Sequence, residues 1–345
     1  MPGIFCIVIT MLILISCSHN TEPVQSYKDP REMTWTYDTL YFPTSLQTEL
    51  YHFLGFNSKD IYVYGHCDDH RGACYRFDGV KWKPVDSADR FFKMVSVSRN
   101  DIYGFGGWIG EVGWQYHWDG LNWTRFNIPN VSEVIWDATR NDNNIIYTCG
   151  EKGVVTKFNG LTWSKEIVNI PLPAKDNFVL NHIIYYNGKL FLNGDNSSYN
   201  GGWTYLIEND GTKYKLIDSM QWWPNKFTWG SAGFYKSPWG VLYSYGYGGI
   251  WEYKVDRWIP YYEAVNPYEK TGAMFGVSED YYFIIKYPRD VVFCRGKEQI
   301  SITEKINLDF SNMTVDGVWT DGKEVFITSV TLHNWPLKTI IIHGK

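Results

Sequence analysis

The chain has 345 residues and a formal net charge of −5, and aromatic residues make up 18% of it. The negative charge argues against nucleic acid as a partner, because nucleic-acid binding needs a basic face. No Walker, Rossmann or HExxH motif occurs in the sequence, so we predict no cofactor.

Residues 1–17 have the pattern of a bacterial lipoprotein signal peptide. The apolar run 4–15 is too short to span a bilayer and fits a signal-peptide core. It ends in Leu14-Ile15-Ser16-Cys17, which resembles a lipobox and predicts a lipid on Cys17. Residues 1–5 lack the positive charge usual in such a signal. An ordinary cleaved signal with an incidental cysteine is the alternative.

Residues 18–32 are polar, contain two prolines and show no periodicity, so we predict a flexible tether. If Cys17 is lipidated, Ser18 follows it. By resemblance to lipoprotein sorting in two-membrane bacteria, Ser at this position favours the outer membrane. The expected location is therefore the bacterial cell envelope, outside the cytoplasm.

The remainder, 33–345, is predicted to be one domain built from a repeated unit. A strand that ends in glycine recurs, and Asp-Gly or Asn-Gly turns followed by an aromatic residue recur after it, as in 78–82, 119–123 and 159–163. The glycines Gly65, Gly106, Gly150, Gly194 and Gly246 are 41, 44, 44 and 52 residues apart. An all-strand period of this length is typical of four-stranded propeller blades, which must stack to bury their faces.

Seven such strands can be counted, and they are marked by Ile61, Ile102, Ile146, Leu190, Leu242, Tyr282 and Val325. The last unit, ending near 340–343, lacks an outer strand, and an unmatched strand at 34–42 precedes the first unit. We therefore predict an all-β, seven-bladed β-propeller whose N-terminal strand completes the last blade and leaves no sheet open.

The pattern D-[IV]-Y-x-x-G … [FW]-[DN]-G-x-x-W resembles the repeat of secreted bacterial β-propeller lipoproteins, and more distantly kelch and WD40 blades. The resemblance covers 33–345. The Trp-Asp and Gly-His signatures of WD40 and the paired glycines of kelch are missing, so no partner of those families carries over.

In such a propeller, the Asp-Gly turns and the turns of the 57–60 type share one face, here called the turn face. The loops between second and third strands and the connections between blades share the other, here called the loop face. The loop face is irregular and rich in aromatic residues, and irregular loops on a rigid scaffold usually carry binding sites. We therefore place the ligand site there.

The candidate residues on the loop face are of two kinds. A first loop holds Asp68, Asp69, His70 and Arg71. Its two carboxylates and the imidazoles of His66 and His70 could ligate a metal but fit a solvated polar loop better, so no metal is predicted. Indoles and polar groups in other loops would suit a sugar or a protein. These residues are Trp108, Glu111, Trp114, Trp203, Trp223, Tyr247, Arg289, His333 and Trp335. The alternative is that the tryptophans pack between blades.

Four cysteines follow the signal. Cys67 and Cys74 bracket one loop, and in an oxidising compartment a disulfide between them is expected. Cys149 and Cys294 lie in separate blades and are predicted to be buried thiols.

The leading functional hypothesis is a membrane-anchored binding or scaffold module for a glycan or protein, without catalytic residues. One alternative is a carbohydrate-active enzyme that pairs Asp68 or Asp69 with Glu111 in the funnel of the propeller. Another is an assembly factor of an outer-membrane complex, which would expose a large apolar patch.

Overall fold

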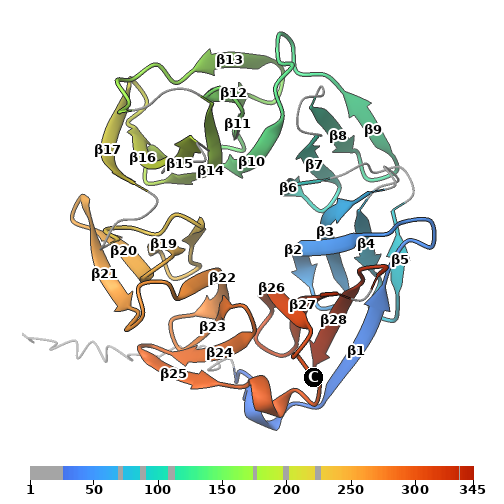
Figure 1. Cartoon of the computed structure of the whole chain (residues 1–345). Helices are drawn as coiled ribbons and strands as arrows, with labels where there is room; N and C mark the ends of the chain where they lie inside the picture. The colour runs from blue at the N-terminus through green and yellow to red at the C-terminus, as the bar shows by residue number, and fades with distance from the viewer. Residues whose placement is uncertain are drawn as a thin grey trace, which may run out of the picture.

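Seven four-stranded antiparallel sheets stand in a ring in the computed structural model (Figure 1). The structure describes residues 26–68, 73–85, 91–107, 113–173, 177–196, 202–221, 227–333 and 335–345. The predicted all-β, seven-bladed propeller is confirmed. Each of the seven marker residues lies in the second strand of its blade and is buried.

Blades 1 to 6 each take four consecutive strands, from the innermost to the outermost. Blades 1 to 3 contain β2 (Thr48–Asn57), β3 (Asp60–Cys67), β4 (Cys74–Phe77), β5 (Trp82–Pro84), β6 (Lys93–Ser98), β7 (Asp101–Gly106), β8 (Trp114–Trp118), β9 (Trp123–Phe126), β10 (Ile135–Arg140), β11 (Ile146–Gly150), β12 (Val154–Phe158) and β13 (Trp163–Ile167). Blades 4 to 6 contain β14 (Phe178–Tyr186), β15 (Lys189–Asn196), β16 (Trp203–Asn209), β17 (Tyr214–Gln221), β18 (Gly233–Lys236), β19 (Leu242–Gly246), β20 (Gly249–Lys254), β21 (Arg257–Glu263), β22 (Lys270–Ser278), β23 (Tyr281–Tyr287), β24 (Asp290–Arg295) and β25 (Glu298–Ser301).

Blade 7 joins the two ends of the chain, as predicted. Its inner strands are β26 (Met313–Thr320), β27 (Val325–Thr331) and β28 (Thr339–Gly344), and its outer strand is β1 (Trp35–Leu40). β1 pairs antiparallel with β28 from Trp35 opposite Gly344 to Leu40 opposite Thr339. Ring closure therefore rests on hydrogen bonds between the first and last strands.

The segment before β1 differs from the prediction in part, because residues 26–32 of the predicted tether lie on the ring. The backbone N–H of Lys28 donates to the Gly322 carbonyl (3.0 Å), and the Tyr27 ring packs on Tyr281. A short 3-10 helix, Pro30–Glu32, follows, and Asp29 forms a 3.0 Å ion pair with Arg295. These contacts involve residues far away in the sequence, so polar composition alone did not reveal them.

The repeated tryptophans join neighbouring blades. Each stands on the outer strand of one blade and meets, edge to face, an aromatic ring on the second strand of the preceding blade. The pairs are Trp82 with Phe326, Trp123 with Tyr62, Trp163 with Phe105 and Trp258 with Phe191, at centroid distances of 5.8 to 6.5 Å. Edge-to-face pairs of this kind add stability beyond the area that they bury.

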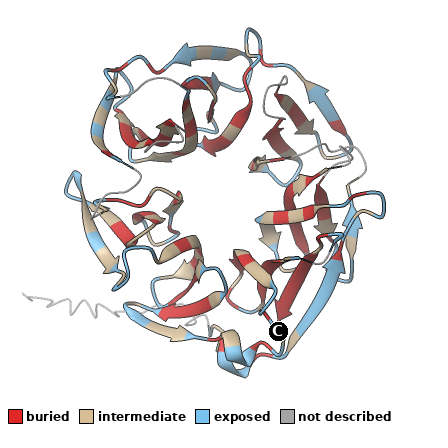
Figure 2. Cartoon of the chain, in the orientation of Figure 1, coloured by how far each residue is buried: buried red, intermediate tan, exposed pale blue. Residues whose placement is uncertain are grey.

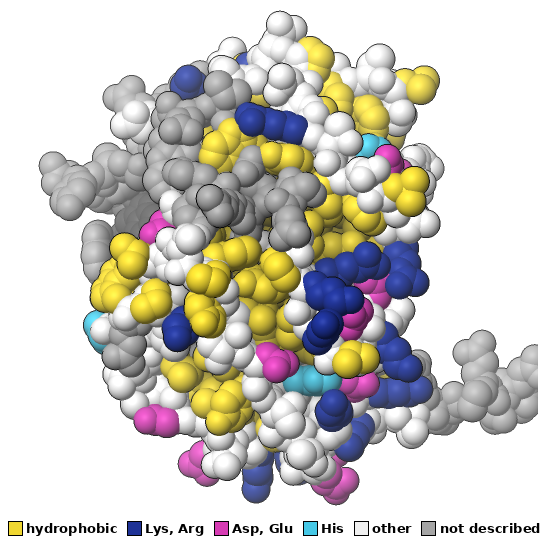
Figure 3. All heavy atoms as spheres, turned by 90° about the vertical axis from the view of Figure 1, so that its right-hand side faces the viewer, with side chains coloured by type: hydrophobic (Ala, Val, Ile, Leu, Met, Phe, Trp, Pro, Cys, Tyr) yellow, Lys and Arg dark blue, Asp and Glu magenta, His cyan; other side chains and the backbone are white. Residues whose placement is uncertain are grey.

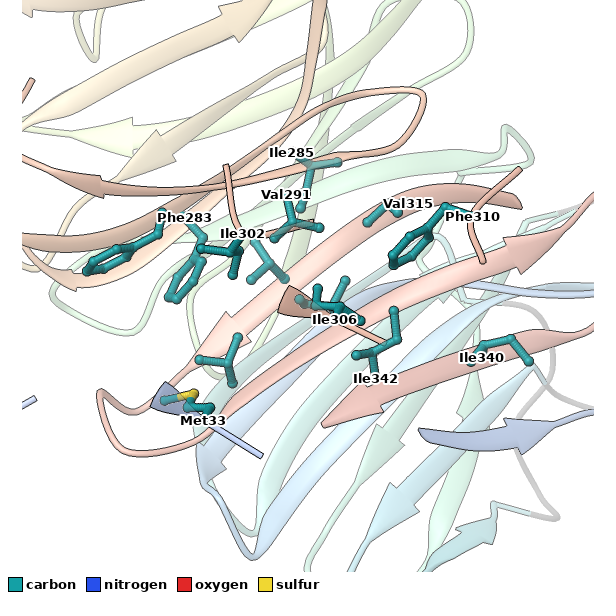
Figure 4. Packing of buried hydrophobic residues seen from close by; sticks show 14 of the residues in the cluster. Met33, Phe283, Ile285, Val291, Ile302, Ile306, Phe310, Val315, Ile340 and Ile342 are labelled. Atoms are coloured by element: carbon teal, nitrogen blue, oxygen red, sulfur yellow. The ribbon is translucent and has the colours of Figure 1, made fainter. Parts of the chain in front are cut away.

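Buried residues concentrate on the second and third strands of each blade, while the innermost strands are mostly half-buried and the outer strands are largely exposed (Figure 2). Figure 4 shows the cluster between blades 6 and 7, where Phe283, Ile285 and Val291 face Val315 and Ile342. Each blade therefore buries its apolar faces against its neighbours rather than in one central core, and the middle of the ring remains available for a channel.

Candidate functional site

The inner strands turn side chains into the channel at β-bulges close to the loop face. In β2, β10, β14 and β26 the pairing register shifts by one residue, and the extra residues are Tyr51, Trp136, Asn181 and Asp316. Phe92, just before β6, takes the same place in blade 2, because the next residue, Lys93, pairs with Phe105. A bulge re-aims a side chain in this way, often beside a functional site.

The repeated glycines make room for these bulges. A Cβ on Gly150 would lie 2.1 Å from the Val134 carbonyl oxygen, and one on Gly65 would lie 2.2 Å from that of Glu49. At both positions the limit is the close approach of the preceding strand. The glycine found in the sequence repeat is therefore required by the bulge that shapes the channel.

Three aromatic rings from successive blades line the channel mouth. Tyr51, Phe92 and Trp136 line a cavity of about 270 Å³ together with Asn181. The rings of Phe92 and Trp136 stack with centroids 4.5 Å apart. The indole Nε1–H of Trp136 is buried and has no hydrogen-bond acceptor among the described residues. We call these four residues the rim.

One residue further along each strand, four blades place a titratable side chain at the same level. These residues are His52, Lys93, Asp137 and His182, and all four line an adjoining channel cavity of about 290 Å³. Blades 5, 6 and 7 have Gly233, Ala273 and Gly317 at that level, opposite Tyr245, Ile285 and Thr328. At this one level the wall therefore carries titratable side chains in blades 1 to 4 and small residues in blades 5 to 7, while Asp316 of blade 7 lines the same cavity one residue before Gly317. We call the four titratable residues the charged layer.

Asp137 is the centre of the charged layer. Its carboxylate accepts hydrogen bonds from the backbone N–H groups of Ala138 (2.8 Å) and Ile183 (3.0 Å). It also lies 2.9 Å from the Lys93 ammonium and 3.6 Å from the His182 ring. Burial acts to raise the pKa of Asp137, but the facing Lys93 and the donors around the carboxylate hold this pKa well below its usual range.

Burial also affects the pKa values of Lys93 and His52 in the charged layer. Burial acts to lower the pKa of Lys93, but Asp137 opposite raises it above its ordinary value. Burial, with Lys93 nearby, lowers the pKa of His52 to about 4, so the imidazole is neutral at pH 7. The Lys93 side chain keeps 37% of its exposure although protein surrounds it, because it points into the open channel. The charged layer is therefore reachable by a ligand from the mouth.

A second, smaller pocket of about 140 Å³ lies beside the mouth and contains one of the predicted residues, Tyr247. Its ring stacks on Phe227 (5.9 Å), and the Lys270 ammonium lies 5.7 Å from both the Tyr247 and Tyr287 rings. Burial lowers the pKa of Lys270 and raises that of Asp195 in the same pocket. Tyr247 is the predicted residue that this pocket contains among its described lining residues, and an aromatic ligand site on the loop face stays a prediction.

Asp68, predicted as a ligand-binding residue, has a structural role. Its carboxylate accepts hydrogen bonds from the Ser45 hydroxyl and from the backbone N–H groups of Leu46 and Gln47. Burial acts to raise its pKa, but these donors hold it below its ordinary value. Asp68 therefore fixes the loop 43–47 and is not poised as a catalytic acid.

The other described candidates do not gather in one place. Trp114 and Trp203 are half-buried and pack against the cores of blades 1–2 and 3–4, as the alternative interpretation held. Arg289, His333 and Trp335 are exposed on the loop face, and Trp335 keeps 60% of its exposure. The predictions for Cys17, Asp69, His70, Arg71, Trp108, Glu111 and Trp223 lie outside the described residues.

The predicted disulfide between Cys67 and Cys74 is not formed; both residues are buried thiols. Cys74 pairs with Tyr64 and packs toward blade 2, whereas Cys67, three residues beyond Tyr64, packs toward blade 7. Successive residues of a strand point to opposite faces of the sheet. The two sulfurs therefore lie on opposite faces of blade 1, which their spacing around a loop did not reveal.

The described part of the chain contains no group of three or more His, Cys, Asp or Glu side chains placed to hold a metal ion. Across the same residues, no helix is long and apolar enough to cross a bilayer.

The residues of the rim and of the charged layer were not among the predicted site residues, although the sequence contains a signal for the charged layer. His52, Lys93, Asp137 and His182 lie 13, 13, 13 and 12 residues before Gly65, Gly106, Gly150 and Gly194. Because the four residues differ in type, the repeat pattern does not include them. An alignment of the four blades on these glycines places the four residues within one position of each other.

The ring of seven blades around a lined channel makes this chain a seven-bladed β-propeller. No protein-family model matches the sequence, and no curated protein matches it. Among solved structures, it is similar to YCF48 bound to a D1 peptide (TM-score 0.59, 12% identity, 92% of this chain and 95% of that one).

Two further structures are similar in the same way. One is YCF48 from Cyanidioschyzon merolae (TM-score 0.53, 10% identity, 89% of this chain and 98% of that one). The other is a catalytically inactive virginiamycin B lyase from Staphylococcus aureus with quinupristin (TM-score 0.58, 10% identity, 90% and 99%). At these identities the likeness establishes the propeller fold, and the resemblance to propeller lipoproteins, kelch and WD40 remains a prediction.

Proposed function

We propose that this chain is a lipid-anchored propeller outside the cytoplasm that binds an extended segment of a protein partner at the channel mouth. The anchor is the Cys17 lipid expected from the lipobox-like residues 14–17, and Ser18 favours the outer membrane. The partner inserts a side chain past the rim toward the charged layer.

The observation that carries this proposal is the buried indole N–H of Trp136 at the rim, which has no acceptor among the residues that the structure describes. A buried donor without an acceptor costs about 1–3 kcal/mol, and a ligand oxygen placed there would remove that cost. A peptide carbonyl supplies such an oxygen, while its neighbouring side chain covers the Tyr51 and Phe92 rings. YCF48, a propeller of similar fold, has been solved bound to a D1 peptide, so a ring of this kind can take a peptide.

The first experiment is photocrosslinking in the native envelope. A benzoylphenylalanine at Tyr51 should capture a protein partner, whereas the same group at Tyr37, which is exposed on the outer strand β1, should not. Mass spectrometry of the crosslink identifies the inserted segment. Equal capture at both positions contradicts the site.

The second experiment measures the affinity of that segment by calorimetry. Trp136→Phe keeps an aromatic ring and removes the N–H, and should weaken binding about tenfold, since 1.4 kcal/mol corresponds to a factor of ten. Trp229→Phe removes an indole N–H that also lacks an acceptor in the described part of the chain but lies in a buried cluster away from the mouth, and this variant should leave affinity unchanged. If an oligosaccharide from a glycan array, and no protein, binds and loses affinity on Trp136→Phe, the partner is a glycan and the proposal is wrong.

A further inference from the structure

The turn face carries a set of exposed aliphatic side chains. Val80, Leu121 and Leu161 occupy the same place in the turns between the third and fourth strands of blades 1, 2 and 3, and Val255 lies in the shorter turn of blade 5. Each keeps more than four-fifths of its exposure. Single exposed apolar residues are common on proteins, but a repeated set on one face marks an interaction surface.

These tips are not required by the turn itself. In each of the first three turns the Asp or Asn two positions earlier accepts backbone hydrogen bonds, as Asp78 does from Val80 and Lys81. Blade 4 builds the same turn around Asp210 with Thr212 at the tip. A polar residue therefore serves the fold equally well, and the aliphatic ones call for another reason.

A basic groove opens beside the same tips, between blades 1 and 2. The groove measures about 470 Å³ and is lined by four cationic side chains, Lys59, Arg76, Lys83 and Arg99, against two carboxylates, Asp60 and Asp78. In a chain whose net charge is −5, this is a local excess of two positive charges. Figure 3 shows Lys and Arg side chains gathered with acidic ones beside hydrophobic side chains on this side of the ring.

The N-terminal segment leaves the ring on the turn face as well. Tyr27 packs on Tyr281, the first residue of β23 in blade 6, and the Lys28 N–H donates to the carbonyl of Gly322 in the turn between β26 and β27 of blade 7. Both partners therefore lie at the turn face. Cys17 precedes Ser26 by nine residues, and a chain of that length spans at most about 30 Å. A lipid on Cys17 would therefore hold the turn face, and not the loop face, close to the bilayer.

We propose that the turn face docks on the surface of a lipid bilayer that contains anionic phospholipid. Val80, Leu121 and Leu161 enter the headgroup region, and the basic groove between blades 1 and 2 receives phosphate headgroups. Apolar tips and basic side chains on one face are the combination that holds a protein at a membrane interface. This inference builds on the proposed anchor, and it points the channel mouth away from the membrane, toward the partner.

The test is the depth of spin labels on the full mature protein bound to vesicles of phosphatidylethanolamine and phosphatidylglycerol. Labels on Leu121→Cys and Leu161→Cys should gain contact with membrane-dissolved oxygen and lose contact with a water-soluble nickel complex when vesicles are added. A label on Val265→Cys, exposed in a loop-face connection, should stay in water. The native cysteines of the described ring are buried, so they do not compete for the label.

A second variant tests the aliphatic tips directly. The triple variant Val80→Thr/Leu121→Thr/Leu161→Thr gives blades 1 to 3 the threonine that blade 4 has naturally. A spin label on Thr212→Cys reports docking of the turn face. When vesicles are added, the change in its contact with oxygen and with the nickel complex should be much smaller in the triple variant than in the otherwise wild-type protein. Exchanging phosphatidylglycerol for phosphatidylcholine should also reduce the change at Leu121→Cys. Labels at 121 and 161 that remain in water on bound protein, or no binding to vesicles at all, overturn the inference.

The outcomes separate this inference from the proposed function. If mass spectrometry finds no lipid on Cys17, the anchor is wrong, yet the labels still decide whether the turn face meets the bilayer. If the Tyr51 crosslink finds no partner while the labels at 121 and 161 are immersed, the channel-mouth proposal fails and the docking surface stands.

Discussion

The Asp137 carboxylate of blade 3 accepts a 3.0 Å hydrogen bond from the backbone N–H of Ile183 in blade 4, and its other oxygen lies 2.9 Å from the Lys93 ammonium of blade 2. One side chain thus joins three successive blades at the level of the channel. The charged layer is therefore part of the wall that holds the ring together as well as a surface for a ligand.

We expect Asp137→Asn to lower the free energy of unfolding by about 2–3 kcal/mol, because it leaves the Lys93 charge without its partner. This loss is at the low end for a buried pair, since Lys93 still reaches the channel. Lys93→Met should cost less, because the Asp137 carboxylate keeps its backbone donors. Urea unfolding measures both values, and a double variant should cost less than the sum. Equal stability of Asp137→Asn and wild type would contradict this account.

The requirement for glycine at the bulges can be tested at Gly150. A Cβ there meets the Val134 carbonyl oxygen at 2.1 Å, so Gly150→Ala must displace the bulge that carries Trp136. We expect a loss of more than about 2 kcal/mol in the free energy of unfolding, in the range of overpacked sites. Gly272→Ala is the matched control, because its nearest contact is the Ile285 oxygen at 3.9 Å. Similar stability of the two variants in thermal unfolding would show that the bulge tolerates a side chain.

The fold could be predicted from the sequence because its determinants repeat. Glycines such as Gly65 and tryptophans such as Trp123 recur at a blade-length period, and each has the same local task in every blade. The closing strand was predictable for a related reason, since a sheet with an open edge needs a fourth strand, and residues 34–42 were available.

The site could not be predicted in the same way, because its residues share a position and not a type. His52 and Asp137 stand at equivalent places in two blades, and only the register of the bulges reveals this. The cysteine prediction failed for a similar reason: the side of the sheet to which Cys67 points depends on strand parity across a pairing that spacing alone does not define.

The pKa of His52 reports how strongly the charged layer is shielded from water. Burial lowers this pKa to about 4. A lowered histidine pKa favours the neutral form, so its contribution to stability is present above pH 6.5 and is lost as the pH falls through about 4. Lys93→Met should raise the pKa of His52, because it removes a positive charge that opposes protonation. Lys236→Met, in a surface pair with Asp142, should not change it. Titration of the imidazole signals by NMR measures this pKa, and an unchanged pKa in Lys93→Met would contradict the coupling.

Asp316 is the bulge residue of blade 7. Burial raises the pKa of its carboxyl to about 6, although the Thr314 hydroxyl donates a 3.0 Å hydrogen bond to it. Because the folded protein binds this proton more tightly than the unfolded chain does, the stabilising effect of protonation is present below pH 3.8 and is lost as the pH rises through about 6. At pH 7.5 the wild type therefore carries an enclosed, ionised carboxylate. Asp316→Asn should raise the free energy of unfolding at that pH by roughly 1–2 kcal/mol, below the full value for such a shift because the side chain borders the open channel.

The pH dependence of this gain separates it from a simple packing effect. The advantage of Asp316→Asn should shrink steadily between pH 6 and pH 4, where the native carboxyl takes up its proton. Asp38→Asn, on the exposed outer strand β1, is the control and should change stability little at any of these pH values. Urea unfolding at pH 7.5, 6 and 4.5 supplies the three comparisons. A gain that stays constant with pH would mean that the amide improves hydrogen bonding at the bulge, and that the carboxylate of Asp316 is well solvated by the channel.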